Sequence, residues 1–209
     1  MALATDLIDH FKLEADFLPD CVQHTILKSD TKLLKRRFRV VQRWKRRRVL
    51  GHGAFGIVWL ESEQKGALRA VKEISKATAE RLKLDYRREL CALVKLSKVC
   101  IGSVASDRPR GLLTLSKHND LFVQLTGWYE NNEHLFLSME YFPLRDLATS
   151  LNTPLAEQHA KEVAKQLLEG LIIMHELGFT HRDMKPGVSQ QDTLQFFVLT
   201  TYTERLCRF

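Results

Sequence analysis

Three groups of residues in this sequence have types and spacings suited to the chemistry of phosphate groups. The first is the run Gly51–Val58, GHGAFGIV, in which three glycines stand between two strand-like patterns. Glycines let backbone N–H groups approach phosphate oxygens without obstruction, and they permit a tight turn. A dinucleotide-binding fingerprint would need a helix directly after the glycines, whereas a strand pattern follows here. The run therefore predicts a glycine hairpin, which is either an ordinary turn or a cover over a phosphate.

The second group centres on Lys72, which stands in the middle of the apolar strand pattern Leu68–Ile74. A lysine in such a strand costs desolvation unless an anion or a carboxylate meets its ammonium group. By spacing alone, that carboxylate would come from Glu80, Asp85 or Glu89, in the charged helical pattern that follows. The alternative is a solvent-facing lysine on a half-exposed strand.

The third group is the hexapeptide His181–Pro186, HRDMKP, which comes shortly after the longest helical pattern of the chain. An aspartate flanked by Arg and Lys stays ionised beside a phosphate, where it can orient a hydroxyl nucleophile and accept its proton. Alone, the hexapeptide would equally suit a charged loop. Its position after the other two groups, in this order, makes it specific.

The elements that would position these groups follow from the spacing of the apolar residues. Strand patterns cover residues 37–44, the two arms of the glycine hairpin within 46–62, Leu68–Ile74, Phe122–Tyr129 and His134–Tyr141, the last two joined by a polar turn at Glu130–Glu133. Helical spacing covers residues 77–97 and Leu155–Leu177, the latter begun by Thr153-Pro154 and ended by Gly178. Residues 1–30 are weakly patterned, with a short amphipathic helix predicted around Leu7–Phe17.

Taken together, the three groups resemble the motifs of a eukaryotic-type protein kinase, from about Trp44 to Pro186. The resemblance implies an α+β, bilobal protein-kinase-like fold, with a five-stranded antiparallel N-lobe, one regulatory helix and an incomplete helical C-lobe. It also implies a protein serine/threonine kinase that uses ATP and Mg²⁺ to phosphorylate Ser/Thr hydroxyls of protein substrates. Lys185, two residues after Asp183, is typical of the Ser/Thr-specific form of this loop.

The same resemblance assigns roles to single residues. Asp183 would be the catalytic aspartate, with Lys185 beside it, and Lys72 would hold the α- and β-phosphates while paired with Glu89. Met139 would be the gatekeeper beside the adenine. The remaining nucleotide-binding residues would be Leu50, Gly51, Gly53, Phe55, Gly56 and Val58 in the lid, Ala70 over the adenine face, Glu140 and Phe142 at its edge, and Asp146 near the ribose or substrate.

Several departures from the family pattern affect the residues that would bind the metal ion. Val188 stands where the loop asparagine should be, and no DFG or APE motif follows Gly187. No other residue is nominated as a metal ligand, and without such ligands the charge on the transferred phosphoryl group is poorly neutralised. We therefore expect the 209-residue chain to lack efficient phosphotransfer. The alternative is a non-catalytic, pseudokinase-like module that binds nucleotide.

A second departure divides the chain. His118-Asn119 resembles a segment that the family places soon after the regulatory helix, but it comes 29 residues after Glu89. We therefore predict an N-terminal extension (1–43), a partial kinase domain (44–187) with an insertion at 99–117, and a divergent tail (188–209). Both irregular segments begin with valine, whose codons start with GT, as splice donors do. Unspliced intron sequence is our hypothesis, and a natural insertion loop with a divergent tail is the alternative.

Composition narrows the cellular compartment and the kinds of partner that the sequence predicts. Apolar residues make up 44% of the chain, and four scattered cysteines indicate free thiols in a reducing compartment. No secretory signal or bilayer-spanning stretch is evident, which favours a soluble cytoplasmic or nuclear protein without membrane partners. Ten basic and no acidic residues lie between Lys32 and Arg48, within a net charge of +7. We interpret this run as a solvated strand; nucleic acid or another anionic partner is the alternative.

Overall fold

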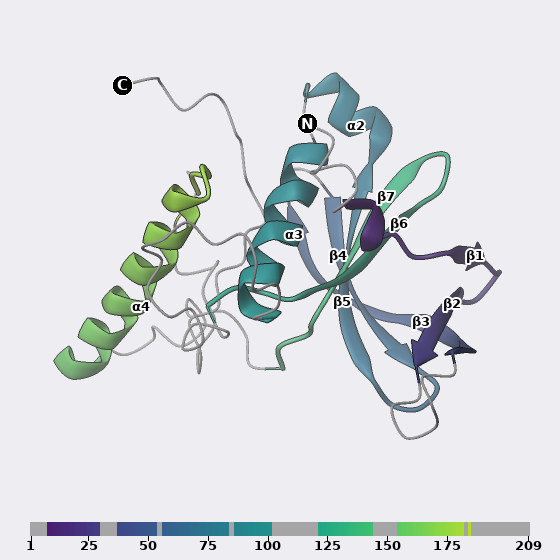
Figure 1. Ribbon diagram of the computed structural model, residues 1–209, viewed down its shortest axis with the longest axis horizontal. Helices are drawn as coiled ribbons and strands as arrows, with labels where there is room; N and C mark the ends of the chain where they lie inside the picture. Colours follow the sequence, from purple (N-terminus) through teal and green to yellow (C-terminus); the bar gives the residue numbers. More distant parts are fainter. Residues whose placement is uncertain are drawn as a thin grey trace. The chain divides into compact units, whose positions relative to one another are not determined.

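The computed structural model describes residues 8–29, 37–53, 56–83, 86–101, 121–143, 154–181 and 184. The chain divides into two compact units (Figure 1). The first comprises residues 1–84 and 125–141 and contains all the strands; the second comprises residues 85–124 and 142–209. Most of the predicted nucleotide-binding residues belong to the first unit, and the HRDMKP loop belongs to the second.

The first unit is built on one antiparallel sheet of seven strands in the order β1-β2-β3-β4-β5-β7-β6. The strands are β1 (Ala15–Phe17), β2 (Val22–Ser29), β3 (Arg37–Gly53), β4 (Gly56–Glu63), β5 (Leu68–Ser75), β6 (Leu125–Glu130) and β7 (His134–Met139). The last five correspond to the strands expected from the sequence. The two additional strands come from the N-terminal extension, and β3 runs without interruption across the predicted boundary at residue 43.

The predicted helix around Leu7–Phe17 was wrong. Among the described residues of this range, only Ile8–His10 is helical, and the chain then extends into β1. The physical reason is visible in the sequence: apolar and polar residues alternate strictly from Phe11 to Phe17, a period of two that buries one face of a strand.

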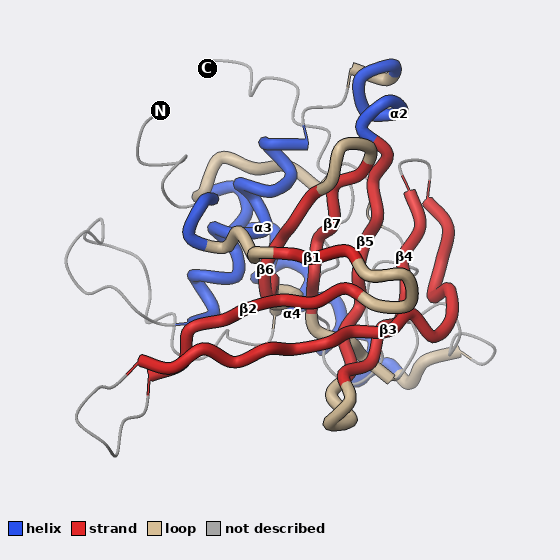
Figure 2. Tube along the Cα trace, turned by 90° about the vertical axis from the view of Figure 1, so that its right-hand side faces the viewer, coloured by secondary structure: helices blue, strands red, loops and turns tan. Residues whose placement is uncertain are grey.

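The segment before β1 joins the two ends of the sheet. Trp128 of β6 donates its backbone N–H to Phe11 O (2.9 Å), and Leu13 donates its own to Trp128 O (2.8 Å). A few residues later, β1 pairs with β2 at the opposite end of the strand order (Figure 2). Gly127 allows this close approach, because a Cβ there would lie 2.6 Å from the Leu13 side chain. Residues 11–17 therefore turn the open sheet into a nearly closed barrel.

The two faces of the sheet have different roles. Directly opposed residues of antiparallel strands share a face, and alternate residues along a strand share one too. One face, here called the Arg69 face, carries Glu61, Arg69 and Val71. Its apolar centre is a buried cluster of Val22, Val71, Tyr129 and Phe136, in which the two aromatic rings stack at 4.9 Å. The other, called the Lys72 face, carries Ala70 and Lys72.

Two helices replace the single one predicted over residues 77–97. Helix α2 (Lys76–Arg81) follows β5 directly, and its first turn is capped by Ser75 Oγ, which accepts from Thr78 N at 3.3 Å. Helix α3 (Tyr86–Ile101) belongs to the second unit and extends into the first residues of the predicted insertion. The break comes after Arg81, where Lys83 adopts a left-handed conformation (φ 52°). Residues 102–117 lie outside the described residues.

Helix α4 (Glu157–Glu176) confirms the long C-terminal helix but begins later than predicted. Ala156 occupies the N-cap without a side-chain hydrogen bond, whereas Thr153-Pro154 was the expected start. The predicted stop is confirmed, because Gly178 takes φ 79°. Part of the apolar face is exposed, with Leu168 61% and Ile172 56% accessible. None of the helices within the described ranges is long and apolar enough to cross a bilayer.

Candidate functional site

The glycine run forms the predicted hairpin between β3 and β4. Gly51 pairs with Val58 and Gly53 with Gly56, so the two strands stay paired up to residues 54–55. Two register shifts in β3, between Arg46 and Arg48 and between Val49 and Gly51, add local twist before the glycines. Leu50 is half-buried at the base of the hairpin, and Phe55 lies outside the described residues.

Two glycines of the hairpin meet different surroundings. A Cβ added at Gly56 would lie 1.9 Å from Glu73 O of the adjacent strand, so this position excludes any side chain. A Cβ added at Gly51 would meet no atom within 4 Å. The contacts made by the described residues therefore require glycine at Gly56 but not at Gly51.

Four predicted nucleotide-binding residues lie together on the Lys72 face. Val58 is paired with Lys72, and Ala70 is paired with Met139. Because Ala70 and Lys72 are two residues apart on β5, both pairs project from the same side of the sheet. Ala70, Lys72 and Met139 are 2%, 5% and 0% exposed. Strands β4, β5 and β7 thus bring an aliphatic surface and one ammonium group together beside the glycine hairpin.

The structure describes some of the remaining predicted site residues and not others. Glu140 and Phe142 follow β7 directly, and both are half-buried. Glu89 lies on α3, but its side chain is not among those described, so its pairing with Lys72 stays a prediction. Asp146, Asp183, Lys185 and the tail 188–209 also lie outside the described residues.

The start of the HRDMKP loop is visible in the second unit. Phe179 N donates to Met174 O at 2.8 Å, which turns the chain back at the end of α4. Phe179 and His181 are then buried, at 8% and 2% exposure, and Lys95 of α3 lies 5.4 Å from the centre of the Phe179 ring. The loop that carries Asp183 thus leaves α4 from a packed position.

Comparisons with known proteins agree with this geometry. The protein kinase domain family matches residues 110–187. The chain is 33% identical over 148 residues to the serine/threonine-protein kinase cds1 of Schizosaccharomyces pombe, covering 66% of this chain and 28% of that one. It is 36% identical over 106 residues to the cell cycle protein kinase DBF2 of Candida albicans, covering 47% and 15%. A crystal structure of Rad53 1-466 in complex with AMP-PNP superimposes with a TM-score of 0.55 at 26% identity, covering 74% of this chain and 39% of that one.

Residues 110–187 match the protein kinase domain family, and the chain is similar to eukaryotic protein kinases. It spans less than a third of the length of the curated relatives it was matched to above. The resemblance to a eukaryotic-type protein kinase deduced from the motifs is thereby confirmed, and cds1, one of the relatives named above, is a serine/threonine-protein kinase. A kinase-like fold is confirmed as well.

Sequence reasoning missed the buried polar residues on the Arg69 face of the sheet. Arg69, Glu61 and His24 are all buried, at 4%, 1% and 1% exposure. A signal was present, because LRAVKEI places charged residues at both even and odd positions of one strand. Such a strand must satisfy charges on both of its faces.

Several residues of the basic run before the glycine hairpin form ion pairs or hydrogen bonds with other residues of the sheet unit. Lys45 pairs with Asp20 (2.6 Å), Arg46 with Glu73 (3.2 Å), and Arg47 Nε donates to Ser62 Oγ (2.6 Å). Lys45 lowers the pKa of the Asp20 carboxyl through this hydrogen bond and its charge. These contacts support the interpretation of the run as a strand of the sheet.

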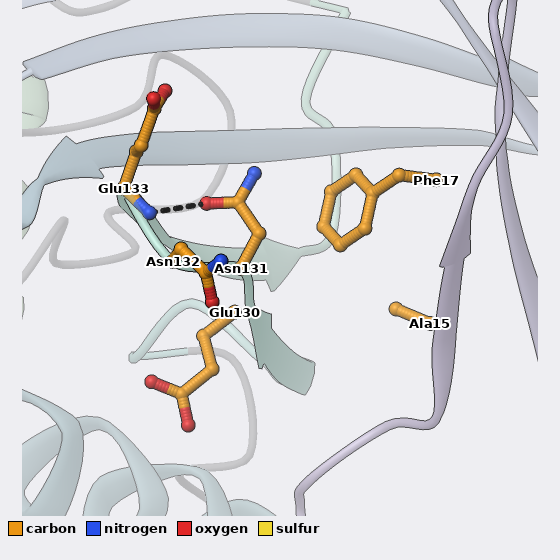
Figure 3. A pocket seen from close by; sticks show the side chains of 6 residues that line it. All are labelled: Ala15, Phe17, Glu130, Asn131, Asn132 and Glu133. Carbon is orange, nitrogen blue, oxygen red and sulfur yellow. Dashed lines mark hydrogen bonds between the residues drawn. The ribbon is translucent and has the colours of Figure 1, made fainter.

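A shallow hollow of about 390 Å³ lies away from the Lys72 face, between β1 and the β6–β7 turn (Figure 3). It is lined by Ala15, Phe17, Glu130, Asn131, Asn132 and Glu133. Lys12 and Lys76, each at 2.8 Å, already bind Glu130 and lower the pKa of its carboxyl. The hollow contains none of the predicted site residues of the kinase domain. Among the described residues, no group of three or more His, Cys, Asp or Glu could hold a metal ion.

Proposed function

We propose that the Lys72 face and the glycine hairpin form an ATP site, and that the chain is the nucleotide-binding part of a protein serine/threonine kinase. The observation that carries the proposal is the strand register, which gathers Val58, Ala70, Lys72 and Met139 on one face beside the hairpin. Relatives named as serine/threonine kinases, and a similar structure in complex with AMP-PNP, support it.

Each part of this face suits one part of the nucleotide. The aliphatic surface of Ala70 and Met139 would pack against the adenine, and the backbone of Glu140 and Phe142 would meet its hydrogen-bonding edge. The Lys72 ammonium would neutralise the α- and β-phosphates. Open space around Gly51 would let the hairpin backbone approach the phosphates.

In the reaction of such a kinase, the γ-phosphoryl group passes to a Ser or Thr hydroxyl of a protein substrate. Asp183 would orient that hydroxyl and accept its proton, and Lys185 would lie beside the transferred group. The family uses Mg²⁺ to neutralise the phosphates, but the donor set does not fit here, because Val188 stands at the position of the loop asparagine. We therefore assign no step to the metal, and we propose that this chain transfers phosphate poorly.

Nucleotide binding and phosphotransfer are tested separately. Isothermal titration with AMP-PNP should show binding to the wild-type chain and a loss of at least about tenfold in Lys72→Met, the size expected for one charge-assisted contact. Lys65→Met is the matched control, because Lys65 is exposed in the β4–β5 turn. Equal affinity in Lys72→Met and wild type would contradict the proposed site.

A phosphotransfer assay with radiolabelled ATP and Mg²⁺ decides between an impaired kinase and a non-catalytic module. We expect little or no turnover, with nucleotide binding retained, which is the pseudokinase-like alternative. Robust Mg²⁺-dependent turnover that is abolished in Asp183→Asn would refute the expected inactivity and would assign Asp183 its catalytic role.

A further inference from the structure

Arg69 is the centre of a buried network on the face of β5 opposite Lys72. Its Nε and Nη2 donate to Glu61 Oε2 at 2.9 and 2.7 Å, and Nη2 also donates to His24 Nε2 at 3.1 Å. The guanidinium carbon lies 4.2 Å from the centre of the Trp44 ring. Arg69 therefore connects β5 to β4, β3 and β2 through a single side chain.

His24 brings the N-terminal extension into this network. Its Nδ1 lies 2.9 Å from Glu14 O, so the ring donates its N–H to that carbonyl and accepts from Arg69 through Nε2. The ring is thus a neutral bridge between the segment before β1 and β5. The same segment is joined to β6 by the backbone bonds of Phe11 and Leu13 to Trp128.

A second anchor holds β5 just beyond Lys72. Glu73 Oε2 accepts from Trp59 Nε1 at 2.7 Å and pairs with Arg46 at 3.2 Å. Arg69 and Glu73 thus flank Lys72 along the strand and project to the opposite face. Consecutive residues of a strand are joined by an extended backbone with little freedom to bend. A shift of β5 at Arg69 therefore also moves the Cα atom of Lys72, from which its side chain extends.

We propose that Arg69, held by Glu61 and by His24 of the N-terminal extension, is a positioning residue that sets the place of Lys72. The segment 8–29 then contributes to nucleotide binding by helping to position Lys72, although it precedes all the kinase-like motifs. Arg69 does not reach the nucleotide; it acts through the backbone of β5. The inference rests on the proposed function only in that Lys72 is taken to bind phosphate.

The test uses the full 209-residue chain and the variant His24→Leu, which fills a similar volume but removes both hydrogen bonds of the ring. Val22→Ala is the matched control: it lies on the same strand and removes buried apolar surface, but it removes none of the side chains that contact Arg69. Both variants are measured at a temperature where circular dichroism shows them folded. If His24→Leu does not fold, Arg69→Lys replaces it, because a lysine keeps the charge and loses the planar fork.

Two readouts separate positioning from stability. The first is the Kd for AMP-PNP, which should rise about tenfold in His24→Leu and stay within about twofold of wild type in Val22→Ala, the size expected for coupling through one packed network. The second needs no nucleotide: the rate at which a small N-hydroxysuccinimide ester acylates Lys72, followed by peptide mass spectrometry. That rate should change at least threefold in His24→Leu, relative to Lys65 as an internal standard.

The outcomes are distinct. Equal effects of Val22→Ala and His24→Leu on both readouts would overturn the inference, since the effect would then come from stability alone. An unchanged acylation rate in His24→Leu would also overturn it. If the wild-type chain does not bind AMP-PNP, the proposed function fails, and the acylation rate alone then decides whether Arg69 positions Lys72.

Discussion

Lowering the pH should destabilise the sheet unit through His24. The ring is buried, it accepts a hydrogen bond from a guanidinium, and burial followed by the Arg69 charge lowers its pKa from 6.5 to about 4. The backbone bond to Glu14 and the charge of Asp16 oppose this shift without cancelling it. Protonation would turn the accepting Nε2 into a second donor facing Arg69, so the folded protein resists the proton that the unfolded chain accepts.

The sign and size of the effect follow from linkage. Below pH 6.5 the unfolded state binds more protons than the folded state, so stability falls as the pH falls from 6.5 towards 4. With these two pKa values, the free energy of unfolding should drop by about 2 kcal/mol between pH 7.5 and pH 5, and by about 3 kcal/mol once the folded ring is titrated. The pKa values of Asp20 and Glu130 are lowered from their ordinary values of 3.8 and 4.5, so these two groups affect stability mainly below pH 5.

Urea unfolding at pH 7.5, 6.5 and 5 measures this contribution. Trp44, Trp59 and Trp128 are the three tryptophans of the chain, and all lie in the sheet unit, so fluorescence reports on that unit. His24→Leu is the reference, because it removes the titrating ring while every other group stays. The wild type should lose about 2 kcal/mol more than the variant over this range. Parallel losses in the two proteins would refute the assignment of a neutral, buried His24.

The remaining predictions concern the hairpin and the turns. Gly56→Ala should destabilise the sheet unit by at least about 2 kcal/mol in the same assay, because its Cβ would overlap Glu73 O, and a change below about 0.5 kcal/mol would contradict the close approach. Gly51→Ala should change stability by less than about 1 kcal/mol, since its Cβ meets no atom, but should weaken AMP-PNP binding; unaltered binding would speak against a role over the phosphates. Asn131→Ala should cost about 1 kcal/mol, because Asn131 Oδ1 accepts from Glu133 N and His134 N at 2.9 and 2.7 Å; no change in urea midpoint would refute this.

Strands β3 to β7 could be predicted because their signals are local. Glycines mark the β3–β4 hairpin, and the polar run Glu130–Glu133 joins β6 to β7 by an Asn turn that needs only neighbouring residues. The Lys72 face was predictable from motif spacing for the same reason: each of its residues belongs to a short recognisable pattern. The division between α2 and α3 was not, because apolar spacing continues through a break that only the backbone of Lys83 reveals.

The N-terminal strands needed information that no local pattern contains. Alternation from Phe11 to Phe17 indicates a strand, but nothing near it in sequence says that Leu13 will pair with Trp128, more than a hundred residues away. Pairings of that separation depend on the rest of the sheet being formed first, since loop closure costs entropy before the contact repays it. From the sequence we predicted that this segment is an extension outside the domain. In the fold, its strands are an integral part of the sheet.

The same reasoning explains why the Arg69 face escaped a motif-based interpretation. Motifs concern groups that would meet a ligand, whereas Arg69, Glu61 and His24 contact one another and neighbouring side chains of the same sheet, such as Trp44 and Tyr129. A buried guanidinium and carboxylate cost desolvation that their mutual attraction only partly offsets, so such a network is weak evidence for stability alone. A hydrophobic trio of similar volume would fill the space at no electrostatic cost. What the polar network adds is a defined geometry: its hydrogen bonds tie Arg69 of β5 to Glu61 of β4 and to His24 of β2, and Lys72 stands on the same strand as Arg69.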